Sequence, residues 1–78
     1  MSEKLYQIIS KIMNIPILEI NDSSSKETIE NWTSFKSYVL LDELETNFNV
    51  KFSIDEAMDV KHVGDIKRHL KNHGVQIE

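Results

Sequence analysis

The residue best placed to carry chemistry is Ser34, which follows Trp32 and Thr33 at the start of a long helical pattern. A hydroxyl at a helix start faces free backbone amides and the positive end of the helix dipole, and both favour negative charge. A phosphate ester on Ser34 would therefore lie in a favourable field. Ser37 is the nearest alternative hydroxyl, and we expect it to be packed or solvated.

The other side chains that could carry chemistry give weaker indications of a functional site. His69 and His73 lie four residues apart, the spacing of two metal ligands on one helical face. No third ligand accompanies them, so we interpret them as a surface pair and expect no metal site. General acid–base catalysis needs a shielded cleft, so we expect solvated carboxylates and no catalytic residue. The carboxylates concerned are Asp42, Glu43, Glu45, Asp55, Glu56 and Asp59.

Size and composition favour a protein that presents chemistry over one that performs it. The 78 residues suffice for a single domain, residues 1–78, and so small a domain buries only about 60% of its unfolded surface. The absence of Cys excludes disulfides and thiolate chemistry. A net charge of −4 argues against nucleic-acid binding and suits partners with basic patches. No apolar run resembles a signal peptide or membrane span, so we expect a cytoplasmic protein without membrane insertion.

Hydrophobic spacing predicts two longer helices in the first part of the chain. The first has an apolar stripe and ends near Pro16, which lacks an amide hydrogen. Residues 17–31 read as a long loop held to the core by a few apolar anchors. The second helix covers about residues 33–47. Its core stripe is Leu40, Leu44 and Phe48, which recur at helical spacing.

A short third helix and a fourth helix complete the predicted all-α four-helix bundle. Ser53 and Glu56 have the spacing of a capping box at the start of the third. Gly74 has the position and residue type of a left-handed cap after the fourth. The apolar positions are Ile54, Ala57 and Met58 in the third helix, and Val63, Ile66 and Leu70 in the fourth.

Several segments stand in a fixed order along the chain, and together they resemble the acyl carrier protein family. They are Trp32-Thr33-Ser34-Phe35, Leu44-Glu45-Thr46-Asn47-Phe48, the capped turn Ser53-Ile54-Asp55-Glu56 and Val63-Gly64-Asp65-Ile66. The resemblance covers nearly the whole chain. In this family the second helix begins with Asp-Ser-Leu, and the serine receives 4'-phosphopantetheine. Ser34 matches that serine.

The resemblance implies a non-catalytic, monomeric carrier. It would hold an acyl, aminoacyl or related group as a thioester on a covalent 4'-phosphopantetheine arm at Ser34. The arm would supply the thiol that a chain without Cys lacks. The implied partners are a phosphopantetheinyl transferase that uses coenzyme A, a loading ligase or acyltransferase, and a downstream synthase or transferase.

Four positions depart from the family pattern. Thr33 replaces the aspartate before the serine, and it can cap a helix but carries no charge. Phe35 replaces the usual leucine. Lys36 and Val39 stand where fatty-acid carriers usually have acidic residues. The resemblance is therefore closer to specialised carriers, as in polyketide, non-ribosomal peptide or cell-envelope pathways, than to a housekeeping fatty-acid carrier.

A helical wheel separates Phe35 and Val39 from the core stripe, so both should be at least partly exposed beside Ser34. We interpret them as a docking patch for the enzymes that load and unload the arm, flanked by Asp42 and Glu43. Packing of Phe35 and Val39 under the long loop is an equal alternative.

Two other functions stay open. One is a carrier-like helical interaction module that is never modified and only binds partners, a possibility that the uncharged Thr33 supports. The other is a very small hydrolase, which the lack of a nucleophile and base in a cleft disfavours.

Overall fold

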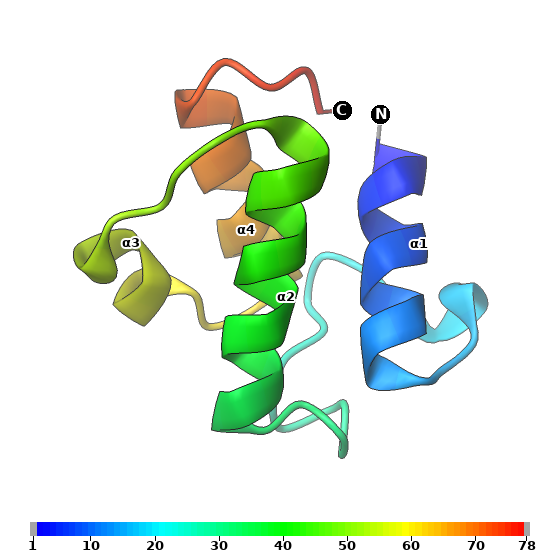
Figure 1. The fold of residues 1–78 in the computed structure, drawn as a ribbon. Helices are drawn as coiled ribbons and strands as arrows, with labels where there is room; N and C mark the ends of the chain where they lie inside the picture. The colour runs from blue at the N-terminus through cyan, green and yellow to red at the C-terminus, as the bar shows by residue number, and fades with distance from the viewer. Residues whose placement is uncertain (1, 78) are drawn as a thin grey trace.

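The computed structural model describes residues 2–77, and four α-helices lie within that range (Figure 1). They are α1 (Ser2–Met13), α2 (Ser34–Phe48), α3 (Ile54–Asp59) and α4 (Val63–Asn72). One 3-10 turn, η1 (Ile17–Glu19), lies in the connection from α1 to α2. The only β character among the described residues is an isolated bridge between Ser25 and His62. The predicted small all-α bundle is confirmed.

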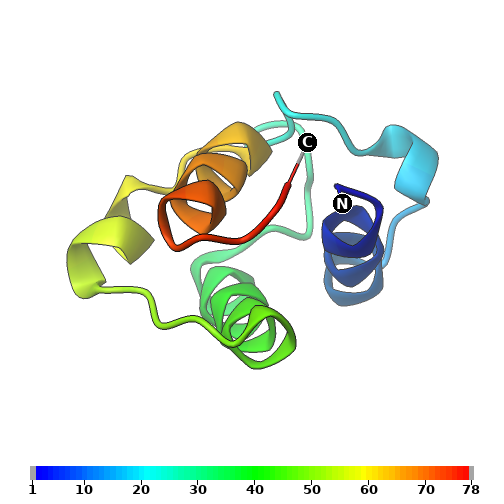
Figure 2. The same ribbon diagram turned by 90° about the horizontal axis from the view of Figure 1, so that it is seen from above.

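The core forms where α1, α2 and α4 turn their apolar stripes toward one another. Seen from above, these three helices surround a common centre (Figure 2). The stripes repeat every three or four residues, the spacing that keeps side chains on one face of a helix. The fully buried side chains are Leu5, Ile9 and Met13 of α1, Leu40 and Leu44 of α2, and Val63, Ile66 and Leu70 of α4. Phe48, which was predicted in the stripe, packs only partly against this core.

The connection from α1 to α2 is held by buried anchors. Ile20, Ile29 and Trp32 are buried, so the expectation that a few apolar residues anchor this connection to the core is confirmed. Ile17 and Leu18 of η1 are exposed instead. α1 and α2 pack against each other and run in opposite directions, so α2 begins beside the end of α1 (Figure 1). Both ends of the described chain lie at the opposite end of the bundle from the start of α2.

α3 is the least anchored helix, because none of its residues is buried. The predicted capping box is confirmed: the Ser53 amide donates to Glu56 Oε1 at 2.8 Å, and the Glu56 amide donates to Ser53 Oγ at 3.1 Å. Two of the three apolar positions noted in this helix, Ile54 and Met58, are exposed. Ala57 takes the inward side of this six-residue helix. Ile54 and Met58, four residues apart, therefore share the outward face.

Hydrogen bonds and ion pairs between polar side chains join α3 to α4, and we call this group the α3–α4 clasp. His69 Nε2 lies 2.9 Å from Asp59 Oδ2, and His73 Nε2 lies 2.8 Å from Glu56 Oε2. The Arg68 guanidinium donates to Asp59 at 2.6 Å. His69 is buried, so its interpretation as a surface residue is wrong. The clasp therefore compensates for the small apolar contact that α3 makes.

Candidate functional site

Ser34 is the first residue of α2 and is exposed. The residue before it caps the helix: Thr33 Oγ1 accepts a hydrogen bond from the Lys36 backbone amide at 3.2 Å. No residue in the described part of the chain hydrogen-bonds to the Ser34 hydroxyl. Because Thr33 performs the capping, the Ser34 hydroxyl is accessible to another molecule.

Ser37, the alternative hydroxyl, is already engaged. Trp32 Nε1 donates to Ser37 Oγ at 2.7 Å. Trp32 is buried, and an indole N–H without an acceptor there would be costly. Of the two serines, Ser34 is therefore the one whose hydroxyl makes no hydrogen bond within the described residues.

Side chains on both sides of Ser34 hold the start of α2 against the end of α1. Asn31 Nδ2 donates to the Met13 carbonyl, and Lys36 Nζ donates to the Ile12 carbonyl, both at 2.8 Å. These carbonyls belong to the last turn of α1, where intrahelical donors are lacking. The Lys36 ammonium is thus an internal link between the two helices, which the sequence did not suggest.

An open hollow of about 520 Å³ lies beside Ser34, between α2 and α3. The buried side chains of Trp32, Leu40 and Leu41 form its floor. Its volume falls within the roughly 300–1,000 Å³ of small-molecule pockets. Ser34 itself lines the hollow, so a group attached to its hydroxyl would start at the edge of an apolar recess.

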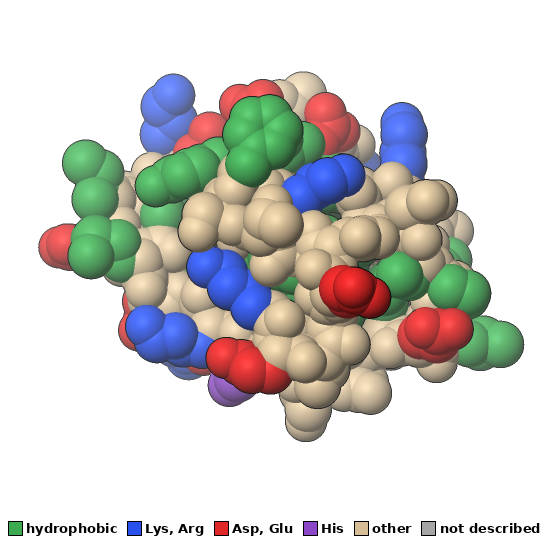
Figure 3. Space-filling view, turned by 90° about the horizontal axis from the view of Figure 1, so that it is seen from below, with side chains coloured by type: hydrophobic (Ala, Val, Ile, Leu, Met, Phe, Trp, Pro, Cys, Tyr) green, Lys and Arg blue, Asp and Glu red, His purple; other side chains and the backbone are tan. Residues whose placement is uncertain are grey.

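Four large apolar side chains are exposed near the start of α2 and on α3. Phe35, Tyr38, Ile54 and Met58 are between 71% and 79% exposed. Figure 3 shows the end of the bundle where α2 begins, with hydrophobic side chains along two edges and basic side chains between them. Tyr38, Ile54 and Met58 were not predicted as surface residues. For Tyr38 a signal was present, because it follows Ser34 by four residues and so shares its helical face.

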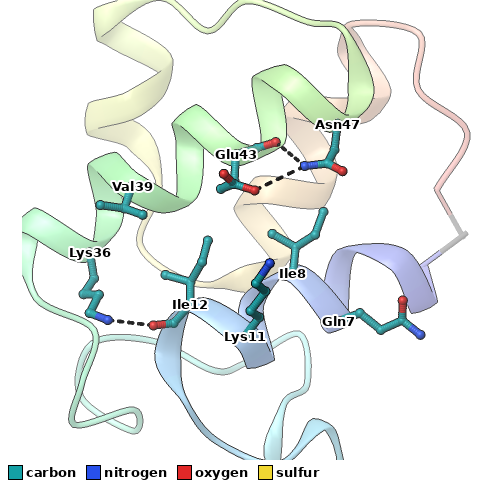
Figure 4. Close-up of a pocket in the computed structure, with 8 residues that line it drawn as sticks. All are labelled: Gln7, Ile8, Lys11, Ile12, Lys36, Val39, Glu43 and Asn47. Carbon is teal, nitrogen blue, oxygen red and sulfur yellow. Dashed lines mark hydrogen bonds between the residues drawn. The ribbon is translucent and has the colours of Figure 1, made fainter.

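The predicted docking patch divides between two surfaces. Phe35 and Asp42 are exposed, as expected. Glu43 is exposed as well, and it lines, with Val39 and Lys36, a groove of about 410 Å³ between α1 and α2 (Figure 4). Val39 is half-buried there, which agrees with the expectation that it is at least partly exposed. Of the two apolar residues in the predicted docking patch, Phe35 is therefore more exposed than Val39.

Two of the carboxylates that the sequence suggested to be solvated, Asp59 and Glu56, have pKa values below the ordinary value because neighbouring groups hydrogen-bond to them. The Arg68 guanidinium, followed by His69, lowers the pKa of Asp59. The Ser53 backbone amide, with His73 adding to it, lowers the pKa of Glu56. Both groups therefore favour the ionised form and bind α4, in keeping with a structural role. Within residues 2–77, no group of His, Asp and Glu side chains is arranged to hold a metal ion.

In comparisons with known proteins, the chain matches no protein-family model and no curated protein at a significant level. None of the helices in residues 2–77 combines the length and apolar character that crossing a membrane requires. The candidate site is therefore defined by its geometry: a free serine hydroxyl at a helix start, beside an apolar hollow.

Proposed function

We propose that the protein is a non-catalytic carrier that holds an acyl, aminoacyl or related group as a thioester on a 4'-phosphopantetheine arm at Ser34, in a specialised biosynthetic pathway. The observation that carries this proposal is the free, exposed Ser34 hydroxyl, which Thr33 relieves of helix capping. The links from Asn31 and Lys36 to α1 support it, because they give the arm a fixed point of attachment. The resemblance of the sequence to acyl carrier proteins supplies the chemistry of the arm.

Attachment of the arm would use a phosphopantetheinyl transferase and coenzyme A. Ser34 Oγ would form a bond to the phosphorus that bears pantetheine, the pyrophosphate linkage would break, and the adenosine bisphosphate half would leave. The hydroxyl proton would pass to a base of the transferase. The free amides at the start of α2 favour the negative charge of the resulting phosphodiester.

Loading and unloading would then take place on the thiol of the arm. A ligase or acyltransferase would form the thioester, and a downstream synthase or transferase would take the group. Such enzymes must contact the surface around Ser34. The exposed side chains of Phe35 and Asp42 remain our proposed contacts, and Tyr38 adds apolar area next to them. Val39 and Glu43 would contribute from the groove beside α1.

The direct test is intact mass after incubation with coenzyme A and a promiscuous transferase. The wild type should gain the mass of one arm. Ser34→Ala should gain none and should melt close to the wild type, because Thr33 caps the helix. Ser37→Ala is the matched control. It should still be modified, yet lose roughly 1–3 kcal/mol of stability because the Trp32 N–H loses its acceptor.

A second candidate is an interaction module that is never modified. The exposed Phe35, Tyr38, Ile54 and Met58 favour it, since a docking surface needs no arm. Thr33, in place of the aspartate of carriers, favours it as well. A wild type that gains no mass would contradict the carrier and support the module, and modification that persists in Ser34→Ala would contradict the assignment of the site.

A further inference from the structure

The groove between α1 and α2 exposes apolar surface that is separate from the hollow beside Ser34. It has a volume of about 410 Å³ and shares no lining residue with that hollow. Ile8 and Ile12 of α1 and Val39 of α2 form its apolar part, and each is half-buried. The two isoleucines extend from α1 toward α2 (Figure 4). Aliphatic surface of both helices is therefore still open to solvent along this groove.

Most residues that line the groove fall on rows in which the spacing is four residues. On α1 the rows are Gln7 with Lys11 and Ile8 with Ile12, and on α2 the row is Val39, Glu43 and Asn47. Rows of this spacing form the ridges through which helices most often pack against one another in globular proteins. α1 and α2 lie against each other and run in opposite directions (Figure 1). A third helix laid along the groove would therefore meet ridges of the same kind on both sides.

The groove has one cation on its α1 side and one anion on its α2 side, and neither is neutralised within the described residues. Lys11 is exposed and forms no ion pair or hydrogen bond there. The exposed Glu43 carboxylate has only the Asn47 side-chain amide, at 3.5 Å from Oε1. The ammonium of Lys36, which also lines the groove, is already bonded to the Ile12 carbonyl. Lys11 and Glu43 are therefore the charges that a partner could pair with.

We propose that this groove docks an amphipathic helix of a partner protein. Aliphatic side chains of that helix, spaced by three and four residues, pack on Ile8, Ile12 and Val39. An acidic side chain on one flank pairs with Lys11, and a basic side chain on the other flank pairs with Glu43. A helix with charges of one sign would meet a like charge on one side of the groove, which disfavours it. The surface goes beyond the carrier function proposed above and does not require it, because none of these contacts involves an arm.

The test is a titration of the isotope-labelled, unmodified protein with synthetic helical peptides, followed by NMR shifts of the backbone amides. The peptides have about 15 residues, near the length at which an isolated helix becomes stable. Both carry the same leucine stripe. The mixed peptide has glutamate on one flank and lysine on the other, and the basic peptide has lysine on both. We expect the mixed peptide to bind saturably and to shift amides of α1 and α2 along the groove.

Two pairs of variants separate the charges of the groove from its apolar part. Lys11→Glu should lower the ratio of mixed-peptide to basic-peptide affinity by roughly 2- to 5-fold, the range for an exposed ion pair, and less at high salt. Lys51→Glu, outside the groove, makes the same change in net charge and should keep the ratio.

Val39→Gln should weaken both peptides, with helical content checked by circular dichroism. Leu18→Gln is its control, because Leu18 is 97% exposed and does not line the groove. It should leave the affinity for both peptides unchanged.

Three results would overturn the proposal: no saturable shift with the mixed peptide, shifts confined to α3 and the surface around Phe35, or equal effects of Lys11→Glu and Lys51→Glu. Sedimentation of the protein alone tests a different occupant. Association that Val39→Gln abolishes would assign the groove to a second copy of the chain and so contradict a partner helix. Failure of Ser34 to accept an arm would contradict the carrier function and leave this titration unaffected.

Discussion

At the start of α2, two adjacent hydroxyl residues have separate roles. The Thr33 hydroxyl accepts a hydrogen bond from the Lys36 backbone amide, and the Ser34 hydroxyl has no hydrogen-bond partner among the described residues. A serine that capped its own helix would have to give up that hydrogen bond on modification. Under the proposed function, an arm on Ser34 would leave the hydrogen bond between Thr33 and the Lys36 amide unchanged.

Lys36 is the residue whose role differs most from the expectation. Its Nζ donates to the Ile12 carbonyl at 2.8 Å. Lys36→Met should therefore lower the stability by roughly 1.5–3 kcal/mol, the range for hydrogen bonds to charged groups. Lys11→Met is the matched control, because Lys11 lines the same groove and is exposed. It should change the stability by less than about 0.5 kcal/mol. Urea denaturation of the three proteins measures both effects, and equal losses would show that the link to Ile12 is unimportant.

The position of Ser34 at a helix start was predictable, because caps and helical spacing are local in sequence. The partner of Lys36 was not, since 24 residues separate it from Ile12. That contact depends on how α1 and α2 pack.

At the scale of the element, α3 is positioned by charge more than by apolar packing. It has no buried residue, and the clasp connects its Glu56 and Asp59 to α4. Its capping box was predictable because both partners lie within four residues. The exposure of Ile54 and Met58 was not, because the inward side of so short a helix is decided by the clasp and by Ala57.

Glu56, which takes part in both the capping box and the clasp, makes the stability of the protein depend on pH on the acid side. The Ser53 backbone amide, with His73, holds the pKa of Glu56 below its ordinary value. This stabilisation is therefore complete above the unfolded-state pKa and is lost as the pH falls through the folded-state pKa. Glu56→Gln, which keeps the geometry of the capping box, should lower the Tm at neutral pH. The difference from the wild type should shrink as the medium becomes acidic.

Melting curves of wild type and Glu56→Gln from neutral to acid pH measure this effect. Asp55→Asn is the control, because Asp55 lies in the same first turn and takes no part in the clasp. A difference in Tm between wild type and Glu56→Gln that stays constant over the whole range would contradict a role for the Glu56 charge.

At the scale of the whole molecule, stability is concentrated where α1, α2 and α4 meet. Leu44 is fully buried there, Phe48 is half-buried at the edge, and Phe35 is exposed. Leu44→Ala should cost roughly 2–5 kcal/mol, and Phe35→Ala less than about 0.5 kcal/mol. Phe48→Ala should lie between them. Chemical denaturation ranks the three, and a loss for Phe35→Ala as large as for Leu44→Ala would show that Phe35 is packed.

The four helices and most of the core were predictable, because an apolar stripe at helical spacing identifies both the helix and its buried face. Phe48 shows the limit of that reasoning. Its spacing places it on the stripe of Leu40 and Leu44, yet α2 reaches the edge of the core at that point, and its ring is half-buried. How far the core extends along α2 depends on the lengths of the neighbouring helices. The spacing of residues within α2 alone does not reveal those lengths.

The position of the chain ends has a practical consequence. The described chain starts and finishes at the far end of the bundle from Ser34 (Figure 1), and the 15 residues of α2 that separate the two ends of the molecule span roughly 22 Å. Coupling to a bead, a sensor surface or a fluorescent protein through either terminus would therefore leave Ser34 and its hollow facing the solution. Such an immobilised protein would present the exposed Ser34 hydroxyl to a transferase in solution, which suits the test of the proposed modification.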